Sequence, residues 1–141
     1  MLFPDEYVNN ITERLTLYNE LSTIKDTKTL EEYEQRLVDR FGPLPKPAKA
    51  LINSIRIKWK ATQLGIEKLI LKQDKMVGYF IGDQQSDFYQ TNRFMQILEY
   101  VQRNGNICKI KEKQTKNGLR LLITFEQVKS IHKALELIEK L

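Results

Sequence analysis

The segment from Leu37 to Pro47 constrains the fold more than any other part of the chain, because it must interrupt a helix. It contains three of the four prolines of the sequence. Gly42 can adopt the left-handed backbone conformation that closes a helix, and Pro43 directly after it cannot continue one. Pro45 or Pro47 suits the first turn of a following helix, where the missing N–H has no partner in any case. The segment therefore predicts a rigid corner between two helices.

Length and composition predict one soluble domain with a single core, or one such domain with a helical extension. The chain has 141 residues, of which 41% are hydrophobic and 29% are charged, which suits one folded domain. Its net charge of +5 permits contact with nucleic acid without requiring it. The single cysteine, Cys108, precludes an internal disulfide and suits a reducing compartment. Neither a signal peptide nor a membrane-spanning run is recognisable, so we expect a cytoplasmic protein with no membrane contact.

Two capping boxes open the first two expected helices. Asn10 with Glu13 predicts the start of the first helix, which we expect to end near Ile24. Thr29 with Glu32 predicts the start of the second. Each helix carries one apolar stripe at spacings of three and four. The stripes consist of Val8, Ile11, Leu15, Tyr18 and Leu21 in the first helix, and of Leu30, Tyr33, Leu37 and Phe41 in the second.

The third expected helix, which Gly65 ends, has two different sides. Its apolar side consists of Ala48, Leu51, Ile52, Ile55, Trp59 and Thr62. The same segment carries five basic residues, Lys46, Lys49, Arg56, Lys58 and Lys60. Such a group can bind phosphates with an affinity that depends on salt. The alternative is an ordinary solvated helix face opposite an apolar stripe.

After Gly65 the periodicity changes to that of strands. Ile66–Lys72 and Met76–Ile81 are expected to form a hairpin through a three-residue connection. Ile107–Gln114 and the strand after it are expected to form another through Asn117–Gly118, a dipeptide typical of type I′ turns. Alternation in the last strand predicts one buried face. That face consists of Leu119, Leu121, Ile123 and Phe125.

A helix is expected after each hairpin. The first has Ser86, Gln90 and Thr91 as alternative starts, ends near Asn104–Gly105, and turns Phe94, Ile97, Leu98 and Val101 inward. The last helix carries Val128, Ile131, Ala134, Leu135, Ile138 and Leu141. The order predicts a single α+β domain, with a three-helix lobe over residues 1–65 and a hairpin–helix–hairpin–helix part over residues 66–141. We expect a mainly antiparallel four-stranded sheet with helices on one face.

The sequence contains no recognisable catalytic or metal-binding pattern. His132, the one histidine, lies one position off the apolar stripe of the last helix, which suits a boundary or solvent position. Cys108 lies in a strand, where a small buried side chain is expected. One histidine and one cysteine do not supply a conventional zinc site, and no glycine-rich phosphate loop occurs. We expect no catalytic residue, no metal and no cofactor.

Three motifs resemble one family. The segment Asp-Arg-Phe-Gly-Pro-Leu-Pro, at Asp39–Pro45, is similar to the signature of the C-terminal domain of the bacterial transcription-repair coupling factor, Mfd. Pro4–Tyr7, followed by Arg14-Leu15 and Tyr18, resembles the start of that domain. Leu64-Gly65-Ile66 resembles the junction between its third helix and its sheet. The matching residues are dense in the first half of the chain and sparse from Glu67 onward.

The resemblance implies that the chain is a fragment of a long, multidomain, ATP-driven DNA translocase. That protein displaces stalled RNA polymerase and recruits the excision-repair protein UvrA through a UvrB-like module. Its motor would lie upstream, so this fragment would have no enzymatic activity and no cofactor of its own. The C-terminal domain would dock on the UvrB-like module of the same parent protein and mask the UvrA-binding surface. UvrA and RNA polymerase would be indirect partners.

The resemblance also implies where docking occurs. In the family, acidic residues on the helix before the Arg-Phe-Gly corner contribute to docking, and Asp39 matches one such position. Arg36 stands where relatives can carry glutamate, so either the contact is rewired or Glu32, one turn earlier, takes its place. The expected partner-binding residues are Glu32, Asp39 and Arg40, next to a structural corner made of Phe41, Gly42, Pro43 and Pro45. A nucleic-acid-binding module that uses the third helix is the alternative.

Overall fold

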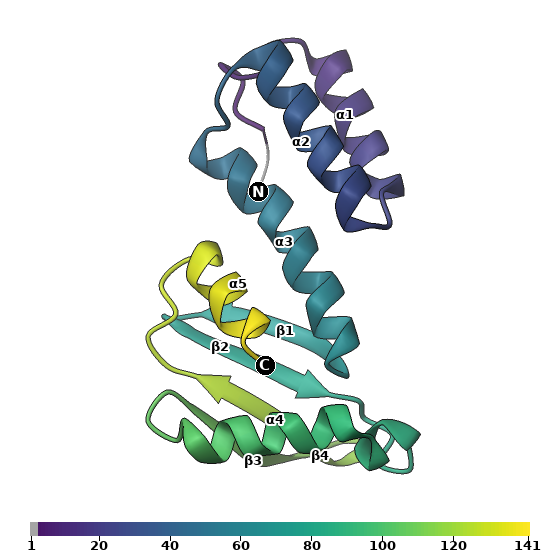
Figure 1. Cartoon of the computed structure of the whole chain (residues 1–141), viewed down its shortest axis with the longest axis vertical. Helices are drawn as coiled ribbons and strands as arrows, with labels where there is room; N and C mark the ends of the chain where they lie inside the picture. The colour runs from purple at the N-terminus through teal and green to yellow at the C-terminus, as the bar shows by residue number, and fades with distance from the viewer. Residues whose placement is uncertain (1–2) are drawn as a thin grey trace. The chain divides into compact units, whose positions relative to one another are not determined.

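Residues 3–141, the part of the chain that the computed structural model describes, have the expected α+β order (Figure 1). The helices are α1 (Ile11–Thr23), α2 (Thr27–Phe41), α3 (Lys46–Gln63), the 3₁₀-helix η1 (Asp87–Gln90), α4 (Asn92–Arg103) and α5 (Ile131–Glu139). The strands are β1 (Ile66–Lys72), β2 (Lys75–Phe80), β3 (Cys108–Thr115) and β4 (Gly118–Phe125). No helix among these residues is long and apolar enough to cross a membrane.

The chain divides into two compact units, Met1–Arg56 and Ile57–Leu141. The division falls within α3, whereas the sequence placed the end of the helical lobe near residue 65. Ile57 and Ala61 belong to the core of the C-terminal unit. The single apolar stripe predicted for α3 is therefore wrong in its second half, where Thr62 is exposed. The last turns of α3 bury a different face because they pack with residues of the sheet.

The apolar stripe predicted for α1 is wrong at two positions. Ile11 is 65% exposed and Leu15 is 56% exposed. Val8 and Leu21 of the same stripe are buried, as predicted. The Tyr33 hydroxyl of α2 donates to the Leu17 carbonyl of α1 (2.9 Å). The spacing of apolar residues predicts an amphipathic helix, but the contact with α2 decides which of these residues are buried.

Side-chain caps determine where the first two helices begin. Asn10 accepts the backbone N–H of Glu13 (3.1 Å), as predicted. The start predicted for α2 is wrong, because Asp26 is the N-cap and accepts the backbone N–H (2.7 Å) and the hydroxyl (2.9 Å) of Thr29. These bonds, the backbone bond foremost, lower the pKa of Asp26. A carboxylate is a favoured N-cap and complements the positive end of the helix dipole, so the helix begins before the expected box with Glu32.

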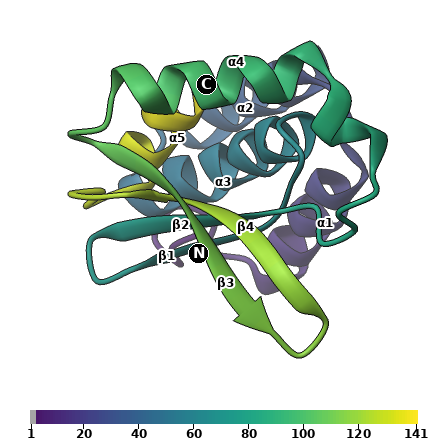
Figure 2. The same cartoon turned by 90° about the horizontal axis from the view of Figure 1, so that it is seen from below.

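The four strands of the C-terminal unit form one antiparallel sheet in the order β1-β2-β4-β3. Figure 2 shows α4, α5 and the end of α3 on one side of this sheet. The core between the layers includes Met76, Phe80, Ile97, Cys108, Ile123, Phe125 and Ile138. The predicted architecture of the sheet and its cover is confirmed.

Both hairpin turns differ by one residue from the prediction. The first is a two-residue turn, in which Gln73 and Asp74 both have positive φ (53° and 61°). In the second, Thr115 pairs with Gly118, so the turn begins one residue before Asn117-Gly118. Only Gly118 of that dipeptide has positive φ (109°). In each hairpin the pairing of the strands extends one residue further toward the turn than in the predicted hairpin. The strand register and the turn length depend on each other.

The buried face predicted for β4 is correct at only one end of the strand. Ile123 and Phe125 are fully buried, whereas Leu119 is 47% exposed. Leu122 and Thr124, on the opposite face, are also buried. These two are shielded because β4 is an inner strand with β2 and β3 on either side.

Polar caps and one glycine define the ends of the remaining helices. Of the alternative starts, Ser86 caps η1 and Thr91 caps α4. Gly65 follows α3 with a φ of +72°, as expected of a helix stop. A Cβ at this position would overlap the ring of Phe88. Glycine is therefore required here both by the backbone conformation and by the packing.

Candidate functional site

The corner between α2 and α3 is fixed by hydrogen bonds around Gly42. This residue has a φ of +91°, and its N–H donates to the Val38 carbonyl (2.9 Å). The Tyr7 hydroxyl lies 2.8 Å from the Gly42 carbonyl and 3.2 Å from the Leu37 carbonyl. Burial raises the pKa of Tyr7, which keeps this donor protonated. The predicted helix stop is confirmed, but no sequence pattern indicated that the Tyr7 hydroxyl bonds to it.

Prolines start the next helix as the sequence predicted. The Pro45 carbonyl accepts the N–H of Lys49 (3.0 Å), and Pro47 lies in the first turn of α3. Leu44, between the prolines, is buried. Pro43 is exposed at the tip of the corner. The corner is therefore a short connection anchored on both sides, which suits a surface that must keep its shape.

Two carboxylates are exposed on one face of α2. Asp39 is exposed near the end of the helix, and its carboxylate accepts a bond from the Gln35 amide (2.9 Å). Glu32 is also exposed. Seven residues separate the two, so they share a helix face about 10 Å apart along the axis.

The arginines of this face are engaged with α1. Arg36 pairs with Glu20, and Arg40 pairs with Glu13. The bond to Glu20 raises the pKa of Arg36. Glu13, which was expected to complete the capping box of α1, faces α2 instead. Sequence spacing does not indicate these pairs, because seven positions separate the two glutamates and four separate the two arginines, and only the contact between α1 and α2 brings them together.

A hollow of about 290 Å³ brings several of the predicted residues together. It is lined by Leu17, Tyr33, Arg36, Leu37, Asp39, Arg40 and Phe41. The apolar members come from both α1 and α2, and the charged members all come from α2. Arg40 also lies over the Phe41 ring, 5.0 Å from its centroid. Such a hollow can accept an apolar side chain of a partner beside a charged contact.

The five basic residues of α3 do not all lie on one face of the helix or belong to one unit. Lys46 and Lys49 are exposed, but Arg56 is half-buried, pairs with Glu34 (2.7 Å) and donates to Asn53 (2.9 Å). The remaining two belong to the C-terminal unit. Residues 58 and 60 are separated by about 200° around a helix and therefore face different directions.

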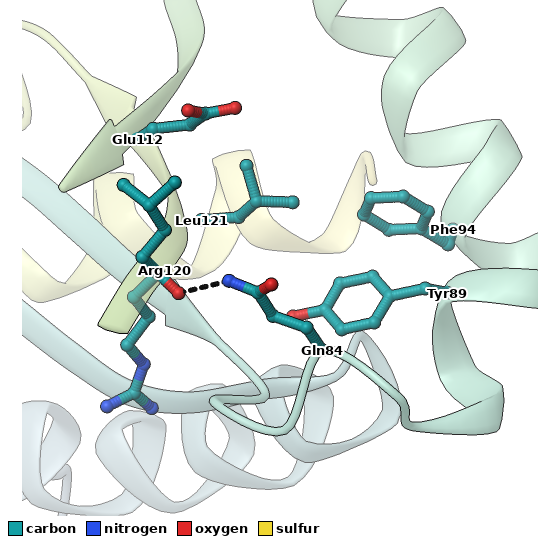
Figure 3. Close-up of a pocket in the computed structure, with 7 residues that line it drawn as sticks. Gln84, Tyr89, Phe94, Glu112, Arg120 and Leu121 are labelled. Carbon is teal, nitrogen blue, oxygen red and sulfur yellow. Dashed lines mark hydrogen bonds between the residues drawn. The ribbon is translucent and has the colours of Figure 1, made fainter. Parts of the chain in front are cut away.

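Another hollow, of about 310 Å³, lies in the C-terminal unit (Figure 3). It is lined by Gln84, Tyr89, Phe94, Glu112, Leu119, Arg120 and Leu121. The Gln84 amide donates to the Leu119 carbonyl, and the Tyr89 hydroxyl donates to the Ile81 carbonyl. Gln84 and Tyr89 of this hollow are therefore already hydrogen-bonded to backbone carbonyls. Glu112 is the one carboxylate in its lining. Within residues 3–141, no cluster of three His, Cys, Asp or Glu side chains is placed to hold a metal ion.

Curated relatives of this chain are named transcription-repair-coupling factor. The protein from Escherichia coli (strain K12) is 40% identical over 68 residues, or 48% of this chain. Those from Rickettsia prowazekii (strain Madrid E) and Buchnera aphidicola subsp. Baizongia pistaciae (strain Bp) are 28% and 27% identical over 79% and 89% of it. The chain spans only 6%, 9% and 17% of the lengths of these three relatives.

A solved structure and a family model agree with these relatives. The crystal structure of the C-terminal domain of a transcription-repair coupling factor superimposes with a TM-score of 0.65. The superposition covers 99% of this chain and 88% of the other at 17% identity, so this likeness concerns the fold alone. The model of the TRCF domain matches residues 1–91, which include the corner and the first hairpin. The chain therefore belongs to the TRCF domain family, a family of transcription-repair coupling factors.

Proposed function

We propose that this chain is the non-catalytic C-terminal regulatory domain of a transcription-repair coupling factor. It docks on the UvrB-like module of its own parent protein and masks the surface that binds UvrA. Membership of the TRCF family supports the parentage, and the much greater length of the relatives supports a fragment of a larger protein. The ATP-driven motor would lie elsewhere in that cytoplasmic parent, and UvrA and RNA polymerase would be reached through it.

The observation that carries this proposal is the exposed carboxylate of Asp39 at the edge of the hollow on α2. Its one hydrogen-bond partner among the described residues is the Gln35 amide, so it remains available to an arginine of a partner. A carboxylate and an arginine form charge-assisted bonds that specify how two surfaces meet. The corner at Gly42 holds the end of α2 in place for such a contact.

An intramolecular lock must also be reversible. Asp39 is exposed, and contacts at an exposed rim contribute modestly to affinity. A ligand that favours the undocked state can therefore release the domain by shifting the population. Glu32, on the same face of α2, provides a second carboxylate for the docked state.

Replacing Asp39 with lysine is expected to weaken binding to the UvrB-like module by about tenfold or more, or about 1.4 kcal/mol. The substitution removes an acceptor and places a like charge opposite the arginine of the partner. Isothermal titration calorimetry of this chain against the UvrB-like module measures the effect. Glu31→Lys makes the same charge change on α2 about 80° away around the helix and should bind like the native chain. Equal affinities of the native chain and Asp39→Lys would contradict the assignment of the contact.

The alternative, nucleic-acid binding through α3, has less support from the geometry. Arg56 is already bonded to Glu34 and Asn53. Lys46 and Lys49 remain exposed on the N-terminal unit. Two exposed lysines on one helix are an ordinary solvated face.

A further inference from the structure

The face of the sheet opposite α4 and α5 is rich in basic side chains. Strand register assigns it Lys68 and Lys72 of β1, Lys75 of β2, Lys109, Lys111 and Lys113 of β3, and Arg120 of β4. Figure 2 shows that α4, α5 and the end of α3 lie on the other side. All six lysines are exposed. We refer to these seven residues as the basic sheet face.

Tyr79 lies at the centre of the basic sheet face. Lys68, Lys113 and Arg120 approach its ring to within 5.7, 5.7 and 5.5 Å of the centroid. Lys113 also donates to the Tyr79 hydroxyl (3.3 Å). Attraction to an aromatic ring can hold several cations close together. Basic side chains from β1, β3 and β4 therefore surround the ring of Tyr79, which belongs to β2.

The positive charge of this face is only partly neutralised within the chain. Arg120 pairs with Glu67 (2.8 Å) and Lys75 pairs with Glu126 (3.6 Å). Among the described residues, no carboxylate lies within 4.0 Å of the ammonium groups of the other five. Moreover, Lys113 stands directly opposite Arg120 in the sheet. Like charges in this position repel each other, and Tyr79 and Glu67 offset this repulsion at Arg120, while Lys113 keeps its positive charge without a carboxylate partner in the described part of the chain.

We propose that the basic sheet face binds the phosphate backbone of duplex DNA. Lys109, Lys111 and Lys113 follow one another along β3 at every second residue, about 7 Å apart. That spacing is close to the separation of successive phosphates in a nucleic-acid strand. Duplex DNA carries one negative charge per about 1.7 Å of its axis, and a lysine row can contact these phosphates without reading the base sequence. The location of the site follows from the strand register. The choice of DNA among polyanions rests on the proposed function.

The alternative ligands fit the face less well. Recognition of single strands uses aromatic rings on which bases stack, but the single ring here, Tyr79, is already surrounded by cations. The face therefore suits phosphates better than bases. The lysines of α3 are not part of it, so the two locations can be tested separately.

The test compares the native chain with the triple variant Lys109→Gln/Lys111→Gln/Lys113→Gln, using fluorescence anisotropy of a labelled duplex. Loss of three phosphate contacts should reduce the slope of log K against log salt by about 2.7. Between about 50 and 200 mM salt, the native chain should therefore lose about 40-fold more affinity than the variant. Lys25→Gln/Lys28→Gln/Lys129→Gln changes the charge equally at exposed lysines elsewhere and should keep the native slope.

Three results would overturn the proposal: native binding by the sheet variant, a loss of binding in Lys46→Gln/Lys49→Gln instead, or tighter binding of a single strand of the same length. Nuclear magnetic resonance of the native chain supplies a second measurement that no variant can disturb. Duplex DNA should shift the amide signals of β3 and leave those of α2 in place. The sheet variant should still bind the UvrB-like module, so failure of the DNA proposal is distinguishable from failure of the docking proposal.

Discussion

Replacing Phe80 with alanine is expected to lower the free energy of unfolding by about 3–5 kcal/mol, which is the cost of removing a fully buried aromatic side chain. Phe80 is completely buried in the core beneath the sheet. Its ring meets Phe94 edge-on, with centroids 5.8 Å apart, and lies 6.4 Å from Phe88. Alanine would leave a cavity among rings that come from η1 and α4, and the loss of these contacts adds to the loss of burial.

Urea denaturation followed by the fluorescence of Trp59 measures this effect, because the only tryptophan of the chain lies in the same unit as Phe80. The matched control is Met95→Ala in α4, where the side chain is 57% exposed and the change should be within about 0.5 kcal/mol. A loss below about 1 kcal/mol for Phe80→Ala would contradict the packing described for this core.

Replacing Tyr33 with alanine is expected to destabilise the helical unit by about 3–5 kcal/mol. Tyr33 is 1% exposed, and its hydroxyl donates to the Leu17 carbonyl of α1. Burial, together with the charge of Glu20, raises the pKa of Tyr33, so it remains a donor at every physiological pH. Tyr33→Phe keeps the ring and should cost only about 1 kcal/mol, the contribution of one hydrogen bond.

Urea denaturation followed by far-ultraviolet circular dichroism compares these two variants with the native chain. Ile11→Ala serves as the control, because this side chain on α1 is 65% exposed and its loss should be nearly neutral. If Tyr33→Phe were as damaging as Tyr33→Ala, the hydroxyl rather than the ring would hold α1 to α2. If Ile11→Ala were strongly destabilising, the exposed position described for Ile11 would be wrong.

Local chemistry explains why the order of elements was predictable from the sequence. A glycine stop at Gly42 and prolines at the start of α3 act through their own backbone geometry, so neighbouring residues suffice to recognise them. The same holds for the caps Asn10, Ser86 and Thr91. Strand and helix periods then distinguished the two halves of the chain.

Features that depend on tertiary contacts were not predictable in this way. The sequence showed that α1 is amphipathic, but contact with α2 decides that Leu21 is buried and Ile11 is not. The buried face changes along α3 because the first part of this helix belongs to one unit and the last part to the other. Similarly, the first hairpin turn is one residue shorter than expected and the second begins one residue earlier, because strand pairing determines where each turn lies.

The candidate sites also include some features that local sequence predicts and others that depend on tertiary contacts. The exposure of Asp39 follows from its place on the polar side of a predicted helix, and the resemblance pointed to it. The engagement of Arg40 with Glu13 required the helix pair. The basic sheet face required the register of four strands, because Lys68, Lys113 and Arg120 are far apart in sequence and meet only at Tyr79.

Masking of the UvrA-binding surface is tested most directly by competition. Binding of UvrA to the isolated UvrB-like module is measured while this chain is added in increasing concentration. We expect the native chain to abolish UvrA binding at saturation, and Asp39→Lys to require about tenfold more protein or more for the same effect. Undiminished UvrA binding at a saturating concentration of the native chain would contradict the proposed function.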